Sequence, residues 1–271
     1  MLSWINGVAA DQLSVRDRGL AYGDGLFETI AVRGQQAPLL ARHLERLSLG
    51  CQRLAIPLDM ALFESELRSF ITQLGDGVAK VVITRGQGQR GYAPPAPCEP
   101  QRIIQGAPAP QYAPANAEQG VQVFACTTRL AEQPLLAGLK HLNRLEQVLA
   151  RAEWSDAVYA EGLMRDVQGR VIEGVFSNLF LVQNGLLLTP DLSRCGVAGV
   201  MRAQIIEQAA EIGLPVNVCE VSWQQLLGAD EVMLCNSLYG IWPVRALASQ
   251  QWPVGPVTRA LQQALKPLFG G

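Results

Sequence analysis

The fold class and the function of this chain depend on the segment LAGLKHLNRL, residues 136–145. It holds Lys140, one of only three lysines in 271 residues, the others being Lys80 and Lys266. The sequence predicts a loop that turns into a helix here, with mostly apolar flanks. The Lys140 amine is then either a solvated charge, as most lysines are, or a desolvated nucleophile that condenses with an aldehyde. Periodicity alone favours the solvated alternative.

The composition is that of a globular chain with a substantial core. The hydrophobic fraction is 49% and the charged fraction 17%. The 271 residues are enough for one large domain or two modest ones. A formal net charge of -2 excludes the basic field that nucleic acid requires. The N-terminus lacks a signal-like start, no apolar run is long enough to span a membrane, and the six cysteines are scattered. We therefore expect reduced thiols, no membrane segment and a cytoplasmic location.

On the N-terminal side of this segment, the pattern predicts an α+β domain over residues 1–107. Asn6-Gly7 favours a hairpin turn, and the leucines of residues 38–54 repeat at helical spacing. A second helix is predicted over 59–74, and strands over 27–33, 78–85 and 102–107. The proline-rich stretch around residues 108–117 has the composition of an inter-domain linker.

On the C-terminal side we expect an α/β domain over residues 118–271. Strands are predicted over 121–127, 156–160, 178–183, 185–189, 215–221 and 230–235, and helices over 140–153, 200–212 and 256–267, with a short helix before residue 230. A cleft between two such domains is a common place for a ligand.

Several motifs of familiar enzymes are missing from the sequence. There is no G-x-x-x-x-G-K-[ST] phosphate loop and no G-x-S-x-G nucleophile elbow. His43 and His141 are the only histidines and stand in no zinc-binding pattern, so we expect no metal. The glycines of residues 85–91 lack the spacing of a dinucleotide loop.

Three other positions carry candidate polar chemistry. Glu173 lies in an apolar stretch, either pointing outward from a strand or buried with a partner. Arg46 lies beside the leucine stripe of its helix, either solvated or binding a phosphate. Residues 199–202 begin a helix after a glycine-containing turn, where free amides either bind an anion or face water.

Taken in order, these segments resemble the fold-type IV pyridoxal phosphate (PLP) enzymes, the family of D-amino-acid and branched-chain aminotransferases. The matching residues span nearly the whole chain: 17–19, 22–28, 42–47, 85–92, 138–147, 173–180, 199–202 and 231–244. The resemblance implies two domains with PLP in the cleft between them. It also implies a homodimer.

The resemblance also assigns roles to single residues. Lys140 would carry PLP covalently, and Glu173 would keep the pyridine nitrogen protonated. The phosphate would bind Arg46, the amides of Val200 and Met201, and the Ser237 hydroxyl. Several aminotransferases of the family have a tyrosine five residues after the lysine, where this chain has Leu145.

Within the family, residues 138–147 and 85–92 resemble the lyases that convert 4-amino-4-deoxychorismate to 4-aminobenzoate and pyruvate. Such a substrate carries two carboxylates, for which Arg90 is the first candidate and Arg85 the second. An aminotransferase on the same fold would use the same Lys140, and a PLP-binding protein without catalysis is a further alternative. A small-molecule substrate is expected in either enzyme.

Overall fold

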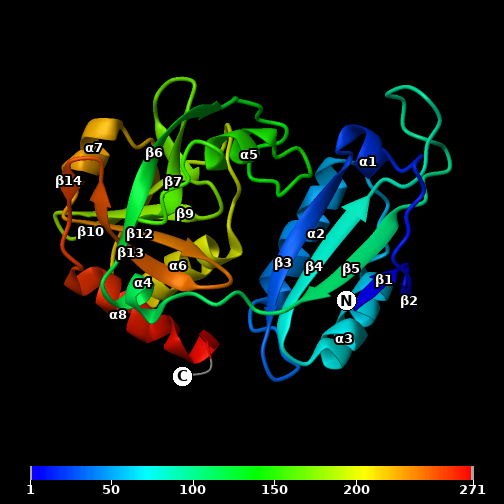
Figure 1. Ribbon diagram of the computed structural model, residues 1–271, viewed down its shortest axis with the longest axis horizontal. Helices are drawn as coiled ribbons and strands as arrows, with labels where there is room; N and C mark the ends of the chain where they lie inside the picture. Colours follow the sequence, from blue (N-terminus) through cyan, green and yellow to red (C-terminus); the bar gives the residue numbers. More distant parts are fainter. Residues whose placement is uncertain (1, 270–271) are drawn as a thin grey trace. The chain divides into compact units, whose positions relative to one another are not determined.

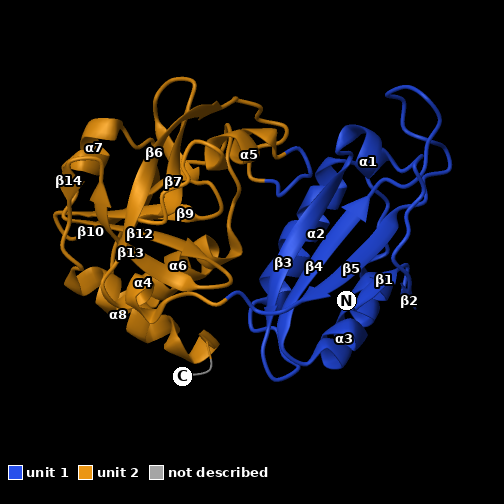
Figure 2. Ribbon diagram, in the orientation of Figure 1, with its two compact units in different colours: residues 1–110, 139–143 blue, residues 111–138, 144–271 orange. Residues whose placement is uncertain are grey.

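The computed structural model describes residues 2–269 and divides into two compact units (Figures 1 and 2). Unit 1 comprises residues 1–110 together with the short segment Leu139–Asn143. Unit 2 comprises Gln111–Gly138 and Arg144–Gly271. Each unit has its own hydrophobic core, and each holds part of the residue set that the sequence analysis singled out.

Unit 1 is an antiparallel sheet covered by two helices. Within its described residues the strand order is β2-β1-β5-β4-β3. The elements are β1 (Ser3–Ile5), β2 (Val8–Ala9), α1 (Arg18–Tyr22), β3 (Gly25–Val32), α2 (Leu40–Arg53), α3 (Met60–Leu74), β4 (Gly77–Thr84) and β5 (Gln101–Ala107).

The predicted hairpin and both predicted helices of this unit are confirmed. Asn6 and Gly7 both have positive φ, 53° and 80°, as a tight hairpin turn requires. Asp59 accepts a hydrogen bond from the amide of Leu62, which fixes the start of α3. The leucine stripe of α2 and the phenylalanines of α3 pack on alternate residues of β3, β4 and β5.

Unit 2 is built on a larger mixed sheet. Within its described residues the order is β11-β10-β9-β12-β13-β6-β7-β8, with β14 added on β13. The strands are β6 (Val121–Leu130), β7 (Tyr159–Asp166), β8 (Val171–Gly174), β9 (Asn178–Gln183), β10 (Leu186–Pro190), β11 (Val216–Cys219), β12 (Glu231–Asn236), β13 (Gly240–Leu247) and β14 (Gln250–Gln251). The helices are α4 (Pro114–Glu118), α5 (Leu145–Arg151), α6 (Val200–Glu211), α7 (Trp223–Leu227), α8 (Pro256–Leu265) and η1 (Lys266–Phe269).

The two ends of this sheet meet. Val171 in β8 forms a bridge with Val221, just beyond β11, and its amide donates to the Val221 carbonyl at 2.9 Å. The sheet therefore curls around the apolar side chains of its inner face, including Leu181, Leu234 and Trp242. The closure brings β8, which carries Glu173, against residues from the opposite end of the sheet.

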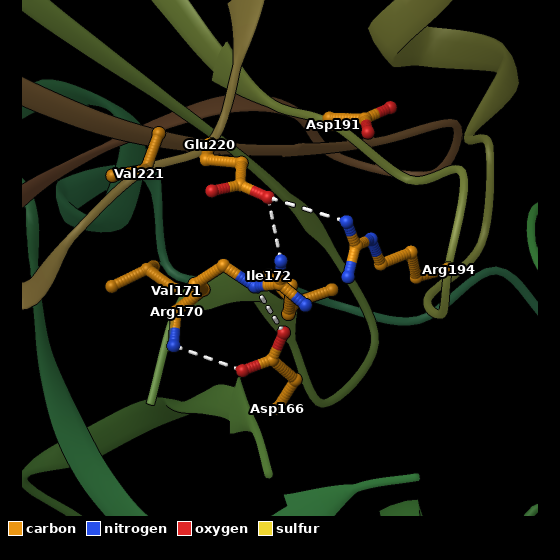
Figure 3. Close-up of a pocket in the computed structure, with 8 residues that line it drawn as sticks. All are labelled: Asp166, Arg170, Val171, Ile172, Asp191, Arg194, Glu220 and Val221. Carbon is orange, nitrogen blue, oxygen red and sulfur yellow. Dashed lines mark hydrogen bonds and ion pairs between the residues drawn. The ribbon is translucent and has the colours of Figure 1, made fainter. Parts of the chain in front are cut away.

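An ion-pair network joins these ends (Figure 3). Arg170 donates through Nε to Asp166 at 2.7 Å and through Nη1 to Glu220 at 2.6 Å, as Figure 3 shows. Its Nη2 donates to Glu132, which the figure does not draw. Asp166 is fully buried and also accepts from the amides of Gln168 and Arg170. One guanidinium thus links the β7–β8 turn to the segment after β11 and the segment after β6.

The units differ from the predicted domains in two respects. Residues 114–117 of the predicted linker belong to helix α4, and the ring of Tyr112 packs on those of Tyr239 and Trp242, with ring centres 5.7 Å and 5.0 Å apart. The second half of the proline-rich stretch therefore belongs to unit 2. Lys140, expected in the C-terminal domain, lies in the segment assigned to unit 1.

Among the described residues, no helix combines the length and the apolar character needed to cross a membrane.

Candidate active site

Lys140 does not lie at a helix start, so the predicted helix over 140–153 is wrong in its first turn. Helix α5 begins only at Leu145. Residues 140–142 instead run beside β3: the Phe27 amide donates to the Lys140 carbonyl at 2.9 Å, and the Leu142 amide to the Gly25 carbonyl at 3.0 Å. These tertiary hydrogen bonds override the local helical pattern.

The flanks of Lys140 keep this segment in place. Leu139 is 1% exposed and belongs to the core of unit 1. Asn143 donates through its side-chain amide to the Gly23 carbonyl at 3.1 Å. Between them, the half-buried Lys140 holds its amine 4.4 Å from the centre of the Phe27 ring. The amine is therefore presented from a fixed backbone and against an aromatic face.

Arg46, the expected phosphate ligand, forms part of a buried charge cluster in unit 1. Its Nε donates to Oε1 of Glu28 at 2.7 Å, and Nη2 lies against Oε2 of the same carboxylate. Nδ1 of His43, one helical turn before Arg46, lies 2.6 Å from Oε2. Glu28 and His43 are each 1% exposed.

The Glu28 carboxylate is stabilised in its charged form by this cluster, whereas the His43 imidazole is not. Burial raises the pKa of Glu28, but Arg46 and His43 outweigh it and lower that pKa to about 2. Burial lowers the pKa of His43, with Glu28 acting in the opposite direction and the positive charges of Arg46 and Lys140 adding to the decrease. Nε2 of His43 is buried without a hydrogen-bond partner among the described atoms.

Glu28 is a residue that the sequence analysis missed. In the stretch Phe27-Glu28-Thr29-Ile30, the alternation of β3 puts Glu28 on the same face as the buried Leu26, Ile30 and Val32. A carboxylate on a buried face requires a cationic partner. That signal was present in the sequence.

Glu173 lies in unit 2, buried in β8 at 4% exposure. Its Oε2 accepts a hydrogen bond from the amide of Val197 at 2.8 Å. The carbonyl of Val197 in turn accepts from Nδ2 of Asn178 at 2.9 Å. Of the two alternatives for Glu173, the structure therefore supports the buried carboxylate with a partner.

Two hydrogen bonds to the backbone of Gly138 hold the loop of residues 196–199, which precedes α6. Gly138 donates to the Gly196 carbonyl at 2.9 Å and accepts from the Ala198 amide at 3.0 Å. At the N-cap, a Cβ on Gly199 would lie 1.9 Å from Oδ1 of Asn178, so only glycine fits there without a shift. The loop and Asn178 thus approach each other closely.

The first turn of α6 is suited to an anion. The first hydrogen bond of the helix runs from the Ala203 amide to the N-cap carbonyl of Gly199 at 3.0 Å. The amides of Val200 and Met201 lie before this first intrahelical hydrogen bond, where an anion can bind. The guanidinium of Arg202 turns inward instead, donating to Thr189 Oγ1 and to the Pro190 carbonyl, both at 2.9 Å. Arg202 therefore anchors the helix start to β10.

Ser237, the other expected phosphate ligand, lies half-buried in the turn between β12 and β13. The preceding Asn236 shapes this turn: its Oδ1 accepts from the amides of Leu238 at 2.9 Å and Tyr239 at 3.0 Å. The backbone that carries the Ser237 hydroxyl is therefore fixed from within the turn.

Glu161 is a second buried acid that the sequence pattern does not indicate, because the strand predicted over 156–160 ends just before it, whereas β7 runs from Tyr159 to Asp166. It is fully buried and accepts hydrogen bonds from the amides of Gly162, Val175 and Phe176 and from the Ser177 hydroxyl, at 2.8 to 3.3 Å. Burial raises the pKa of Glu161 to about 8, although these hydrogen bonds lower it. Its carboxylate holds the turn between β8, which carries Glu173, and β9.

The two substrate-binding candidates have different surroundings. Arg90 is exposed in the loop after β4. Arg85 is 8% exposed and donates to Asp24 at 2.8 Å and to the carbonyls of Ala55 and Leu54 at 2.9 and 2.7 Å. Each side-chain nitrogen of Arg85 makes a hydrogen bond within unit 1, so Arg90 is the more accessible of the two for a carboxylate. Leu145, five residues after Lys140, is 75% exposed at the start of α5.

The chain belongs to the class IV amino-transferase family, whose sequence profile matches residues 25–247. A 4-amino-4-deoxychorismate lyase of known structure from Pseudomonas aeruginosa is 64% identical to it, with 98% of each chain covered and a TM-score of 0.97. The aminodeoxychorismate lyase of Vibrio harveyi is 38% identical over 96% of this chain and 97% of its own length. The Escherichia coli branched-chain amino acid aminotransferase is 27% identical, covering 99% of this chain and 94% of its own, with a TM-score of 0.86. The expected fold-type IV class with two domains is confirmed.

Proposed function

We propose that this chain is a PLP-dependent lyase that converts 4-amino-4-deoxychorismate to 4-aminobenzoate and pyruvate, a carbon–oxygen bond cleavage in folate biosynthesis. The observation that carries the proposal is the Lys140 amine, held against the Phe27 ring by a backbone hydrogen-bonded to β3. The relatives named as lyases, at 64% and 38% identity over almost the whole chain, support the choice of substrate.

The residues present fit PLP. The cofactor requires a primary amine for its aldehyde, a carboxylate for its pyridine nitrogen and an anion site for its phosphate. Lys140 supplies the amine and the buried Glu173 the carboxylate. The anion site would comprise Arg46, the amides of Val200 and Met201, and the Ser237 hydroxyl. Hydrogen bonds fix three of these groups: Arg46 bonds to Glu28, Glu173 to the Val197 amide, and Arg202 at the start of α6 to Thr189.

Bound PLP supplies a protonated ring that accepts electron density from the carbon being deprotonated. Glu173 would keep the proton on the pyridine nitrogen of the cofactor. The Lys140 amine would remove the proton from the substrate carbon that bears the amine. The bond between the neighbouring substrate carbon and the enolpyruvyl oxygen would then break, the substrate ring would become aromatic, and the enolpyruvate would take up one proton to become pyruvate. No net proton or electron is consumed.

Arg90 is the proposed ligand for a substrate carboxylate, because a guanidinium matches a carboxylate through two parallel hydrogen bonds. Its exposure leaves its side chain accessible to a ligand. The substrate carries two carboxylates, and Arg90 would bind one of them.

The decisive experiment supplies 4-amino-4-deoxychorismate to the purified holoenzyme and measures 4-aminobenzoate and pyruvate. Equal amounts of the two products support the proposal. Lys140→Ala should abolish both products and the visible absorbance of the bound cofactor, whereas Lys80→Ala, which removes an exposed lysine of β4, should change neither.

An aminotransferase is the competing function, because the Escherichia coli relative has the same fold. Rapid amino-group exchange between a branched-chain amino acid or D-alanine and 2-oxoglutarate, without lyase activity, would favour that function. A protein that binds PLP without catalysis would keep the absorbance and show neither reaction.

We further propose that the chain is a cytoplasmic homodimer. All six cysteines are unpaired thiols, as a reducing compartment favours. Light scattering on the purified holoenzyme tests the dimer: a monomer mass would contradict it.

A further inference from the structure

Arg18 is a buried cation whose nitrogens reach another part of unit 1. The residue is 4% exposed at the first position of α1. Its Nη1 donates to the carbonyls of Gly91 and Ala93 at 3.0 and 3.3 Å, and its Nη2 to the carbonyl of Tyr92 at 3.0 Å. Three consecutive carbonyls thus converge on one guanidinium.

These carbonyls belong to the loop that carries Arg90. The loop is exposed: Tyr92 has 85% of its surface accessible, and Arg90 and Gly91 are exposed as well. A second tether comes from α1, because the Gly91 amide donates to the Tyr22 hydroxyl at 3.2 Å. An exposed loop with few apolar contacts is ordinarily among the least stable parts of a protein. In this loop, hydrogen bonds from the buried Arg18 side chain hold the backbone where apolar contacts are few.

The charge of Arg18 is balanced beneath the loop. Its Nε donates to Oδ2 of Asp24 at 2.8 Å, and Nε of Arg85 donates to the same oxygen at 2.8 Å. Burial raises the pKa of Asp24, but the hydrogen bonds and charges of Arg85 and Arg18 outweigh it and lower the pKa. Arg85 is itself fixed by hydrogen bonds to two backbone carbonyls. Because Arg85 fixes Asp24, the Asp24 carboxylate in turn fixes the position of Arg18.

We propose that Arg18 is a positioning residue: its buried guanidinium fixes the backbone of residues 91–93 and so presents Arg90 to a carboxylate of the substrate. This inference rests on the proposed function, because it needs Arg90 as the carboxylate ligand. The planar fork of a guanidinium can hold adjacent carbonyls at fixed separations, whereas an ammonium is a single point charge. Lysine therefore cannot replace Arg18.

The loop itself is tested by amide hydrogen exchange, followed by mass spectrometry of peptides that contain residues 89–94. In Arg18→Lys we expect exchange at least about tenfold faster there than in the unsubstituted holoenzyme. Tyr22→Phe removes only the second tether and should give a smaller increase. Arg102→Met is the matched control, because Arg102 is also a partly buried arginine of unit 1 but pairs with Glu66. It should leave exchange in this loop unchanged.

Steady-state kinetics test the consequence for the substrate. We expect KM for 4-amino-4-deoxychorismate to rise about tenfold in Arg18→Lys with kcat nearly unchanged, as for loss of uniform substrate binding. Arg90→Met should raise KM at least as much, and the double variant no further than Arg90→Met. The absorbance of the bound cofactor should be the same in all variants.

Two results separate the parts of the inference. Unchanged loop exchange in Arg18→Lys overturns the positioning role of Arg18, whatever Tyr22→Phe shows. An unaltered KM in Arg90→Met overturns the carboxylate ligand, whatever the exchange shows. Failure of the lyase reaction itself is seen separately, in the unsubstituted holoenzyme.

Discussion

The guanidinium of Arg46 donates, through Nε, a 2.7 Å hydrogen bond to Oε1 of Glu28. The two residues come from α2 and β3, and the carboxylate is 1% exposed. The Glu28 carboxylate fixes the orientation of the Arg46 guanidinium. It also partly neutralises the positive charge of Arg46 in the absence of a phosphate. The pair therefore contributes both to the stability of unit 1 and to the proposed anion site.

Replacing Glu28 by glutamine should destabilise the protein by about 3 kcal/mol, because the Arg46 guanidinium would remain buried without its anion. Urea denaturation measures the change. Glu64→Gln is the control: its partner Arg68 lies four residues on in the same helix, at the surface, and its loss should cost less than about 0.5 kcal/mol. Equal effects in the two variants would contradict a buried, mutually dependent cluster.

Glu161 should make the stability of unit 2 depend on pH. Burial raises its folded-state pKa from the ordinary 4.5 to about 8. The folded protein then holds a proton that the unfolded chain releases, so the stabilisation is complete below pH 4.5 and is lost as pH rises to about 8. We expect the free energy of unfolding to fall by up to about 1.4 kcal/mol per pH unit in this interval. In Glu161→Gln this contribution should vanish, and an unchanged slope in denaturation curves would refute it.

Arg170 and Arg194 offer a matched pair in the network of Figure 3. Arg170→Met removes three carboxylate contacts and leaves the fully buried Asp166 without its cation, so we expect a loss of about 3 kcal/mol. The side chain of Arg194 is 52% exposed and lies 3.7 and 3.9 Å from its partners. Arg194→Met should therefore cost less than about 1 kcal/mol. Thermal unfolding of both variants measures the two losses. Similar losses would contradict the inference that Arg170, and not Arg194, joins the two ends of the unit 2 sheet.

Gly199→Ala should weaken cofactor binding more than it weakens the fold. The new Cβ would lie 1.9 Å from Oδ1 of Asn178, which must shift and move the start of α6. We expect a loss of about 2 kcal/mol in stability and at least about a tenfold weaker PLP affinity, measured by fluorescence titration. At Gly228 a Cβ would meet nothing nearer than 3.4 Å, and φ is -89°. Gly228→Ala should bind PLP normally, and a normal affinity in Gly199→Ala would count against a phosphate site at α6.

The sequence determined the elements whose cause is local. The hairpin at Asn6-Gly7, the helices α2, α3 and α6, and most strands follow from turn chemistry and apolar periodicity, and the structure confirms them. The order of short motifs around Lys140 and Glu173 also determined the family, which the comparisons confirm. Those motifs nominated residues, but they did not say what surrounds each of them.

Tertiary structure alone decided the surroundings. Lys140 lies in an extended segment because its neighbours bond to β3 from more than a hundred residues away, whereas the local pattern indicated a helix. Arg85 is buried and donates hydrogen bonds to Asp24 and to two backbone carbonyls, whereas Arg90, five residues further on, is exposed. Both residues are arginines in the same glycine-rich stretch, so the local sequence does not distinguish them. Burial and hydrogen-bond partners depend on contacts distant in the chain, and no local periodicity encodes them.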